Sequence, residues 1–146
     1  MKQLDFNVKY TEIKNILKKE KSIVLCTSNG SKVAARTVYF VYFKDCIYFV
    51  TSMSYKKYKQ IEKNQNVALC FSNIQIVGVA SILGHPNLEG NKNILEYMEK
   101  NCSEMYKYVK YKNTVLIKVS IDDIEMWEKG GREYLNIENK TANRIG

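Results

Sequence analysis

The sequence of 146 residues contains one proline, one histidine and four cysteines, and these low counts narrow the kind of protein it can be. No CxxC pair occurs and the cysteines are far apart, so no zinc site or other metal site is expected. Cys26, Cys46 and Cys70 lie in apolar, strand-like runs. They are expected to be reduced and buried, as small apolar residues.

Long apolar runs are also missing. No stretch of about 18 apolar residues occurs, so no membrane-spanning helix is expected. The opening "MKQLDFNVKY" has no apolar segment of the signal-peptide type, and a cytoplasmic location is expected. No repeat, linker or low-complexity tract interrupts the chain, which predicts a single domain over residues 1–146.

Positive charge is in excess, with 23 Lys and Arg against 15 Asp and Glu, a formal net charge of +8. Such a balance favours anionic partners, including phosphate ligands and nucleic acid. The lysines are spread along the chain apart from a small cluster at 56–59. A lysine-rich composition of the whole genome would produce the same excess, so charge alone does not choose a partner.

Short β-rich runs separated by turn signals dominate the pattern. Asn29-Gly30 and Lys44-Asp45 are turn signals between strands, which predicts antiparallel hairpins. Gly78 lies inside a strand and indicates a bulge or a bend. The expected strands are 22–28, 32–43, 46–52, 66–71, 74–83 and 114–121, with two short ones within 124–137. The expected helices are 11–20, begun by Thr11 as N-cap, and 54–64, 91–101 and 103–111.

This order predicts a mainly β fold, a β-barrel with short flanking helices. Strands that follow one another as a meander, with a long twisted member, favour a closed or split antiparallel barrel. A parallel sheet is not expected, because helices do not separate the strands at regular intervals.

The stretch "TSMSYKKYKQIEKN" predicts an anion site at the start of the helix 54–64. Ser54 is the expected N-cap, and Lys56 and Lys57 fill the first turn, where free backbone N–H groups and the helix dipole already favour negative charge. The alternative is a solvated helix, since Lys59 and Lys63 lie on it too.

Arg36 lies in the middle of the strand 32–43, where a charge is costly unless it is paired or faces a ligand. Alternation places it on one face with Ala34, Val38 and Phe40. The hairpin at 44–45 brings Thr51 back beside the start of this strand. Arg36, Thr51 and the two lysines would then line one pocket suited to a phosphate on an organic cofactor. A salt bridge between Arg36 and an acidic neighbour is the alternative.

Several of these residues, taken in order, resemble the pattern of a known protein family. The run "ARTVYFVYFKDCIYFVTSMSYKKYKQIEKNQNVALCFSNIQIVGVASI" resembles the pyridoxamine 5'-phosphate oxidase-like, FMN-binding split-barrel superfamily. "VLIKVSIDDIEMWE" is similar to that superfamily's late strand and terminal tryptophan. The resemblance covers residues 22–83 best. The matching positions are Arg36, Thr51, Lys57, Gln60, Ile61, Asn64 and Gly78-Val79-Ala80.

The resemblance implies a split antiparallel β-barrel of the FMN-binding type, with FMN at the interface of a homodimer. Lys56 and Lys57 would hold the phosphate, and Asn73 or Gln75 would reach the flavin from the other subunit. Trp127 would lie at the interface or at the flavin edge, or else pack in the core. The implied cofactor-binding residues are Arg36, Thr37, Val38, Val50, Thr51, Lys56, Lys57, Asn73 and Gln75.

The ending "NKTANRIG" lacks the arginine-rich segment with which such oxidases bind the substrate phosphate. The resemblance therefore indicates a relative other than a true pyridoxamine phosphate oxidase. The function it implies is electron transfer from a reduced donor such as NAD(P)H through FMN to a small, unidentified acceptor. No catalytic side chain can be named. His85 would protonate a substrate or ligate haem, or would be an ordinary exposed loop histidine.

Two other classes remain open. One is a flavin or haem carrier or sensor without turnover, and a deazaflavin is an alternative to FMN. The other is a small nucleic-acid-binding barrel, which needs aromatic side chains exposed on one sheet face. Tyr39, Phe40, Tyr42 and Phe43 occupy both faces of one strand. This favours burial in a core and an interface, so nucleic acid is not the expected partner.

Overall fold

The computed structural model describes residues 1–146, which form a mainly antiparallel β structure with short helices. The strands are β1 (Lys2–Leu4), β2 (Ser22–Ser28), β3 (Val33–Tyr39), β4 (Val41–Phe43), β5 (Cys46–Ser52), β6 (Asn66–Phe71), β7 (Ile74–Ile82), β8 (Thr114–Glu128), β9 (Gly131–Asn136) and β10 (Thr141–Ile145). The α-helices are α1 (Phe6–Lys19), α2 (Lys56–Lys63), α3 (Lys92–Asn101) and α4 (Ser103–Tyr106), and η1 (Glu89–Asn91) is a short 3-10 helix.

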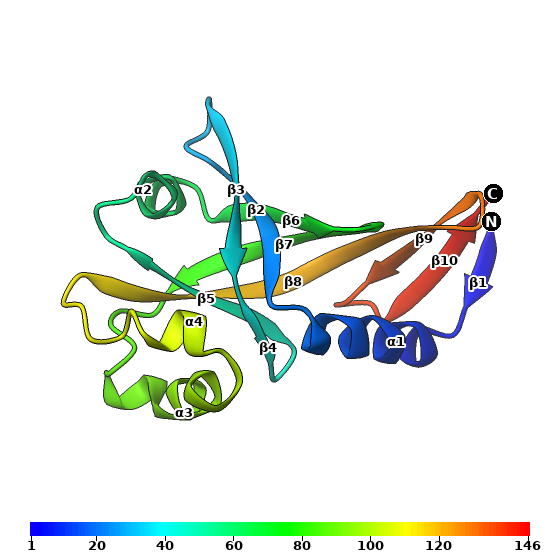
Figure 1. Ribbon diagram of the computed structural model, residues 1–146. Coiled ribbons are helices and arrows are strands. Elements are labelled where there is room, and N and C mark those ends of the chain that lie inside the picture. Colours follow the sequence, from blue (N-terminus) through cyan, green and yellow to red (C-terminus); the bar gives the residue numbers. More distant parts are fainter.

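The strands join in the order β1-β10-β9-β8-β7-β6-β2-β3. The first half of β8 also pairs with β5, on the edge opposite β7, and β5 in turn pairs with β4. The sheet curls around a core but does not close, because β3 hydrogen-bonds to β2 alone. This confirms the predicted split antiparallel barrel. Figure 1 shows β8 continuing beyond the barrel into an extension formed with β9, β10 and β1, along which α1 lies.

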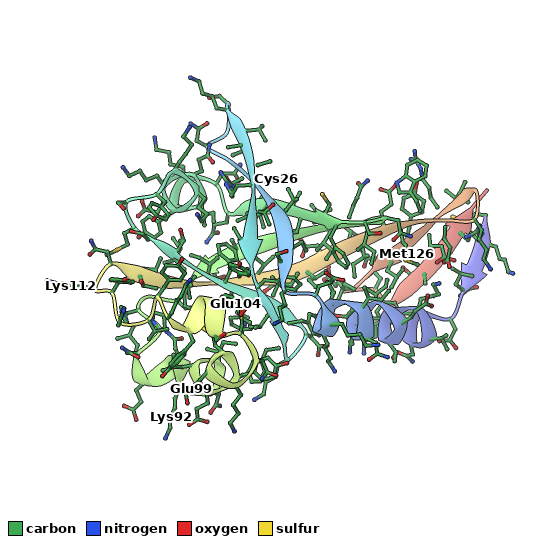
Figure 2. The ribbon with its side chains drawn as sticks, viewed as in Figure 1. Cys26, Lys92, Glu99, Glu104, Lys112 and Met126 are labelled. Carbon is green, nitrogen blue, oxygen red and sulfur yellow. The ribbon has the colours of Figure 1, made fainter.

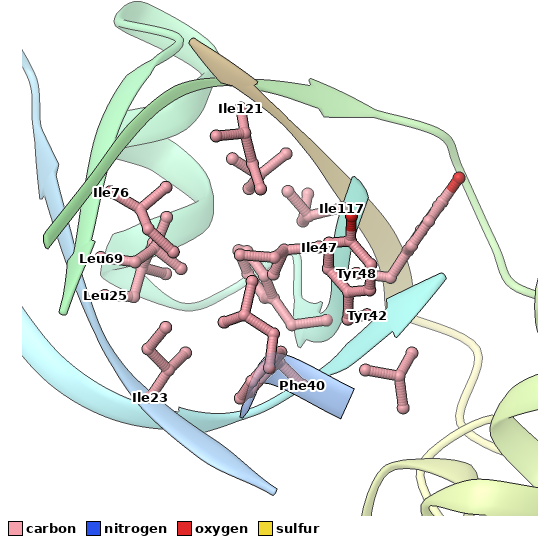
Figure 3. Close-up of a cluster of buried hydrophobic side chains, with 14 of the residues drawn as sticks. Ile23, Leu25, Phe40, Tyr42, Ile47, Tyr48, Leu69, Ile76, Ile117 and Ile121 are labelled. Carbon is pink, nitrogen blue, oxygen red and sulfur yellow. The ribbon is translucent and has the colours of Figure 1, made fainter. Parts of the chain in front are cut away.

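Inward-facing aliphatic and aromatic side chains from the curled strands form the core. Ile23 and Leu25 of β2 meet Leu69 of β6 and Ile76 of β7 inside the barrel, and all four are almost fully buried (Figure 3). They alternate with exposed or half-buried residues on the same strands, as period-2 patterning requires.

The turns and the glycine bulge are where the sequence indicated. Lys44 and Asp45 both have positive φ, as a two-residue hairpin loop between β4 and β5 requires. The pairing of β7 with β8 shifts register between Val77 and Gly78. A Cβ at Gly78 would collide with the carbonyl oxygen of Ser120, so the close approach of the two backbones explains the glycine.

Three boundaries differ from expectation. The strand predicted over 32–43 is interrupted at Phe40, so that β3 pairs with β2 and β4 pairs with β5. Helix α1 begins five residues before the predicted N-cap Thr11, because the Asp5 carboxylate accepts a hydrogen bond from the Val8 N–H. The helix expected over 103–111 ends at Tyr106 and continues as turns.

Helix α2 also begins later than predicted. Its N-cap is Tyr55, which makes no side-chain capping bond, and the hydroxyl of Ser54 instead lies 2.9 Å from that of Ser52. The prediction of Ser54 as N-cap was therefore wrong.

The cysteines are all free, as expected, but their burial differs from expectation. Cys26, Cys46 and Cys70 are half-buried, because they occupy strand positions whose side chains alternate with the buried core residues. Cys102, at the junction of α3 and α4, is buried.

Strands β1 and β10 were not expected, and β8 is longer than expected because it absorbs the short strand anticipated after residue 121. None of the helices is both long and apolar enough to cross a membrane. The single domain over residues 1–146 stays a prediction.

Candidate functional site

A cleft of about 660 Å³ opens beside the end of β5, in the size range of small-molecule sites. One wall comes from β3, β5 and the start of α2, and the other from α4 and the loop that leads into β8. Figure 2 shows Glu104 on α4 and Lys112 on that loop. The lining residues are Thr37, Val38, Tyr39, Val50, Thr51, Ser52, Tyr55, Lys57, Glu104, Met105, Tyr108, Tyr111, Lys112, Asn113 and Thr114.

Strand pairing fixes the floor of the cleft. Thr51 and Ser52 of β5 pair with Val115 and Thr114 at the start of β8. The Met53 N–H donates to the Asn113 carbonyl at 3.0 Å, which holds the two walls together just beyond the strands. The floor of the cleft is therefore built on sheet structure.

The hydroxyl of Thr51 is the main anomaly of the cleft. The residue is 6% exposed, and its Oγ1 atom is buried without any hydrogen-bond partner. An unpaired buried hydroxyl costs about 1–3 kcal/mol, and native structures contain few of them. Thr51 is also among the residues that line the cleft, so this hydroxyl lies beneath the cleft surface.

Lys57 is a half-buried cation that makes no salt bridge. Its pKa lies below its ordinary value, first because burial disfavours the charged form and second because the guanidinium of Arg36 repels it. Two neighbouring cations without a carboxylate create a local excess of positive charge, which an anion would neutralise.

Arg36 lies behind the cleft surface and is held in place by hydrogen bonds. Its Nη1 donates to the Leu25 carbonyl at 3.2 Å and to the Thr27 hydroxyl at 2.8 Å, and that hydroxyl donates to Oε1 of Gln60 at 2.5 Å. This chain connects β3 to α2 through buried polar groups. The alternative that Arg36 forms a salt bridge with an acidic neighbour is wrong, and burial lowers the pKa of its guanidinium.

The structure brings together part of the expected set. Thr37, Val38, Val50, Thr51 and Lys57 line the cleft, with Arg36 behind them. Lys56 is exposed on the outer side of α2 and is not among the lining residues.

Asn73 and Gln75 lie elsewhere, on the β6–β7 turn and on β7. The Asn73 amide donates to the Trp127 carbonyl, and Gln75 borders a shallow depression. Trp127 is 45% exposed and stacks on Arg132, whose guanidinium carbon is 3.7 Å from the ring centroid. The core-packing alternative for Trp127 is therefore wrong.

His85 is engaged on both ring nitrogens. Nδ1 accepts from the Asn87 N–H at 3.0 Å, so Nε2 carries the hydrogen and donates to the Tyr111 carbonyl at 2.9 Å. The ring is half-buried and ties the loop after β7 to the wall of the cleft. Neither nitrogen is free to bind a metal, which favours the alternative of an ordinary loop histidine, although the residue is half-buried rather than exposed.

Sequence reasoning missed the second wall. Tyr108 and Tyr111 were expected within the helix 103–111 and given no role, and Lys112 lay outside every predicted element, although "YKYVKYK" places tyrosines and lysines in alternation just before a strand. Glu104 is the one carboxylate among the lining residues. Its pKa is held below the usual range, chiefly by its own backbone N–H, so it is ionised at neutral pH.

Comparison with known proteins now identifies the family. None of the curated proteins matches the sequence. ChuZ from Campylobacter jejuni has a similar structure, with a TM-score of 0.82 and 17% identity over 98% of this chain and 64% of ChuZ. This chain therefore spans less than two thirds of that protein.

Two shorter proteins are also similar. General Stress Protein 26 from Bacillus anthracis str. Sterne gives a TM-score of 0.65 and 25% identity over 87% of this chain and 97% of its own. HutZ from Vibrio cholerae, described as a haem storage protein, gives a TM-score of 0.64 and 13% identity over 82% of this chain and 92% of HutZ. The family model described as "Pyridoxamine 5'-phosphate oxidase like" matches residues 9–144, and the chain therefore belongs to this family.

Proposed function

We propose that the chain binds FMN in the cleft beside β5 and passes electrons from a reduced donor, NAD(P)H, through the flavin to a small acceptor. The observation that carries the proposal is the half-buried cation Lys57, which lines the cleft without a salt bridge and whose charge is repelled by Arg36 behind it. Membership of the pyridoxamine 5'-phosphate oxidase-like family supports a flavin ligand, and one similar structure is described as a FAD-binding protein.

The donor set fits such a cofactor. A phosphate accepts hydrogen bonds and carries negative charge. Neither Lys57 nor Arg36 has a negatively charged partner in the structure. The exposed Thr37 would offer a hydroxyl to the ribityl chain, and Val38 and Val50 give apolar surface for a ring system. Lys56, at the first position of α2, adds positive charge outside the cleft.

When bound, FMN supplies the redox chemistry, and the protein supplies binding, orientation and exclusion of water. Thr37 would contact the cofactor through its hydroxyl, and Thr51 would form part of the cleft floor. Lys57 would hold its anionic end, with the charge of Arg36 behind it, and the tyrosines of the opposite wall would limit access of solvent. No side chain of the cleft is paired with another as nucleophile and base, so we assign none a role in proton transfer.

A homodimer is part of the proposal. Asn73 and Gln75 do not reach the cleft of their own chain, and they contribute to a flavin site only if a second copy supplies them. Val77 and Trp127, near these residues, are 50% and 45% exposed, which favours a partner surface. A cytoplasmic location stays a prediction.

The test is a comparison of FMN with riboflavin, which lacks the phosphate. Purified protein should be loaded by added FMN, and quenching of flavin fluorescence should give a dissociation constant at least about 10-fold lower for FMN, from one or more charge-assisted contacts. NAD(P)H should then bleach the bound flavin. Equal affinities for the two flavins would refute the phosphate assignment, and loaded protein that NAD(P)H never bleaches would refute turnover.

A haem or flavin carrier is the second candidate. It is favoured by similar structures described as a haem storage protein from Vibrio cholerae and a haem binding protein from Mycobacterium smegmatis, although at 13% and 11% identity these show the fold alone. His85 argues against haem, because both of its ring nitrogens are engaged. A Soret band after haem titration that survives the variant His85→Ala would support a carrier with another ligand.

A further inference from the structure

We propose that the cleft wall formed by residues 106–112, here called the tyrosine–lysine wall, binds the adenine nucleotide half of the electron donor and selects NADPH over NADH. The inference rests on the proposed function, because it places the donor next to a flavin held at Lys57. It adds a donor site and a donor preference that follow from the side chains of this wall.

The wall presents aromatic surface. Tyr108 and Tyr111 are 43% and 54% exposed, and both line the cleft. Their ring centroids are 6.2 Å apart and the planes meet at 39°. Exposed tyrosine rings at the mouth of a cleft offer stacking faces for a planar heterocycle.

The same wall carries cations beside each ring. Lys107 Nζ lies 5.2 Å from the Tyr108 ring centroid, and Lys110 Nζ lies 5.4 Å from that of Tyr111. Lys112 lines the cleft itself, and none of the three makes a salt bridge. Stacking faces flanked by free ammonium groups fit a base joined to phosphate.

The wall is fixed in position by its backbone. The Tyr108 carbonyl accepts from the Thr114 hydroxyl at 2.7 Å, and the Tyr111 carbonyl accepts from His85 Nε2 at 2.9 Å. The Tyr111 N–H also donates to the Tyr108 carbonyl at 3.1 Å. A ligand therefore meets rings whose backbone is already ordered, which reduces the entropy lost on binding.

The arrangement favours a dinucleotide over a single strand of nucleic acid. The wall lines the same cleft as Thr51 and Lys57, so a ligand stacked on it would lie beside the proposed cofactor. A dinucleotide concentrates its phosphates near the outer lysines, and NADPH carries one more phosphate than NADH.

The test uses two redox-inactive probes, 2′,5′-ADP and 5′-AMP. Each is titrated into FMN-loaded protein in a calorimeter. We expect 2′,5′-ADP to bind about 10-fold more tightly, which is the value of one added charge-assisted contact. Tyr111→Ala should weaken both probes about 10-fold, because it removes a stacking face. Lys110→Gln with Lys112→Gln should erase the difference between the probes. Lys2→Gln, at an exposed position on β1, is the matched control and should change neither.

Equal affinities for the two probes, or an unchanged affinity in Tyr111→Ala, would overturn the proposal. Tighter binding of an oligothymidylate that is also lost in Tyr111→Ala would assign the wall to nucleic acid instead. The variant Lys57→Gln shows whether 2′,5′-ADP has entered the phosphate site, since wall binding should be unchanged by it. If FMN does not load but 2′,5′-ADP binding to the apo-protein depends on the wall, the proposed flavin function fails while the nucleotide site stands.

Discussion

Replacing Lys57 by glutamine should move two measurable quantities in opposite directions. In the protein without ligand, Lys57 is half-buried, has no acidic partner and is repelled by Arg36, so the charge is unfavourable. With a phosphate bound, the same charge becomes a direct attraction. Lys57→Gln should therefore leave the free energy of unfolding unchanged or slightly higher while it weakens FMN binding.

The magnitudes follow from the surroundings of the side chain. A hydrogen bond to a charged group contributes about 1.5–3 kcal/mol, so the dissociation constant for FMN should rise about 10- to 150-fold. Solvent screens the repulsion from Arg36, so the increase in stability should be no more than about 1 kcal/mol.

The pH dependence follows from the same side chain. Because the pKa of folded Lys57 lies below 10.5, the cost of its charge is present at neutral pH and disappears as pH rises through the lowered pKa. FMN affinity should fall in that same alkaline range.

Fluorescence titration of FMN and urea unfolding of the apo-protein measure the two effects. Lys59→Gln is the matched control, since Lys59 is an exposed lysine of the same helix that does not line the cleft. A Lys57→Gln variant that binds FMN as well as the unmodified protein does would refute the reasoning. So would a loss of apo-protein stability of more than about 1 kcal/mol, because the charge would then be stabilising.

Two further predictions concern stability. Gly78→Ala should lower the free energy of unfolding by about 1–3 kcal/mol, because the new Cβ meets the Ser120 carbonyl. Gly90→Ala, with open space around the glycine, should be nearly neutral. Urea denaturation of both variants checks this, and equal free energies of unfolding would contradict it. Asp45, whose pKa is held below 3.8 by a hydrogen bond from Lys14, should contribute up to about 1 kcal/mol at neutral pH that is lost as pH falls through its folded pKa. Asp45→Asn should therefore be less stable than the unmodified protein at pH 7 but equally stable in strong acid, and a pH-independent difference would count against the ion pair.

The barrel could be predicted from the sequence because its signals are local. Alternating apolar residues, the turn at Lys44-Asp45 and the strand glycine at Gly78 each state a backbone preference without help from distant residues. The break at Phe40 could not be predicted in this way, because it depends on β3 and β4 choosing different partners. The short terminal strands likewise depend on distant partners, because β1 pairs with β10 and β10 pairs with both β1 and β9.

The candidate site was predictable on one side only. Thr51 and Lys57 lie on elements joined by a short turn, so sequence order already brought them together. Tyr108 and Tyr111 reach the same cleft only because β8 pairs with β5 and carries the preceding loop alongside. The role of His85 in fixing that loop depends on a carbonyl 26 residues away, which no local pattern encodes.

The first and last strands are neighbours, with Lys2 opposite Arg144, and Figure 1 shows both ends of the chain at the far tip from α2. Because residues near the two ends are paired, a short peptide could join the ends. The joined chain could then be opened at an exposed turn such as Asn29-Gly30. A fluorescent or affinity label attached at either end would stand well clear of the mouth of the cleft, leaving ligand entry unobstructed.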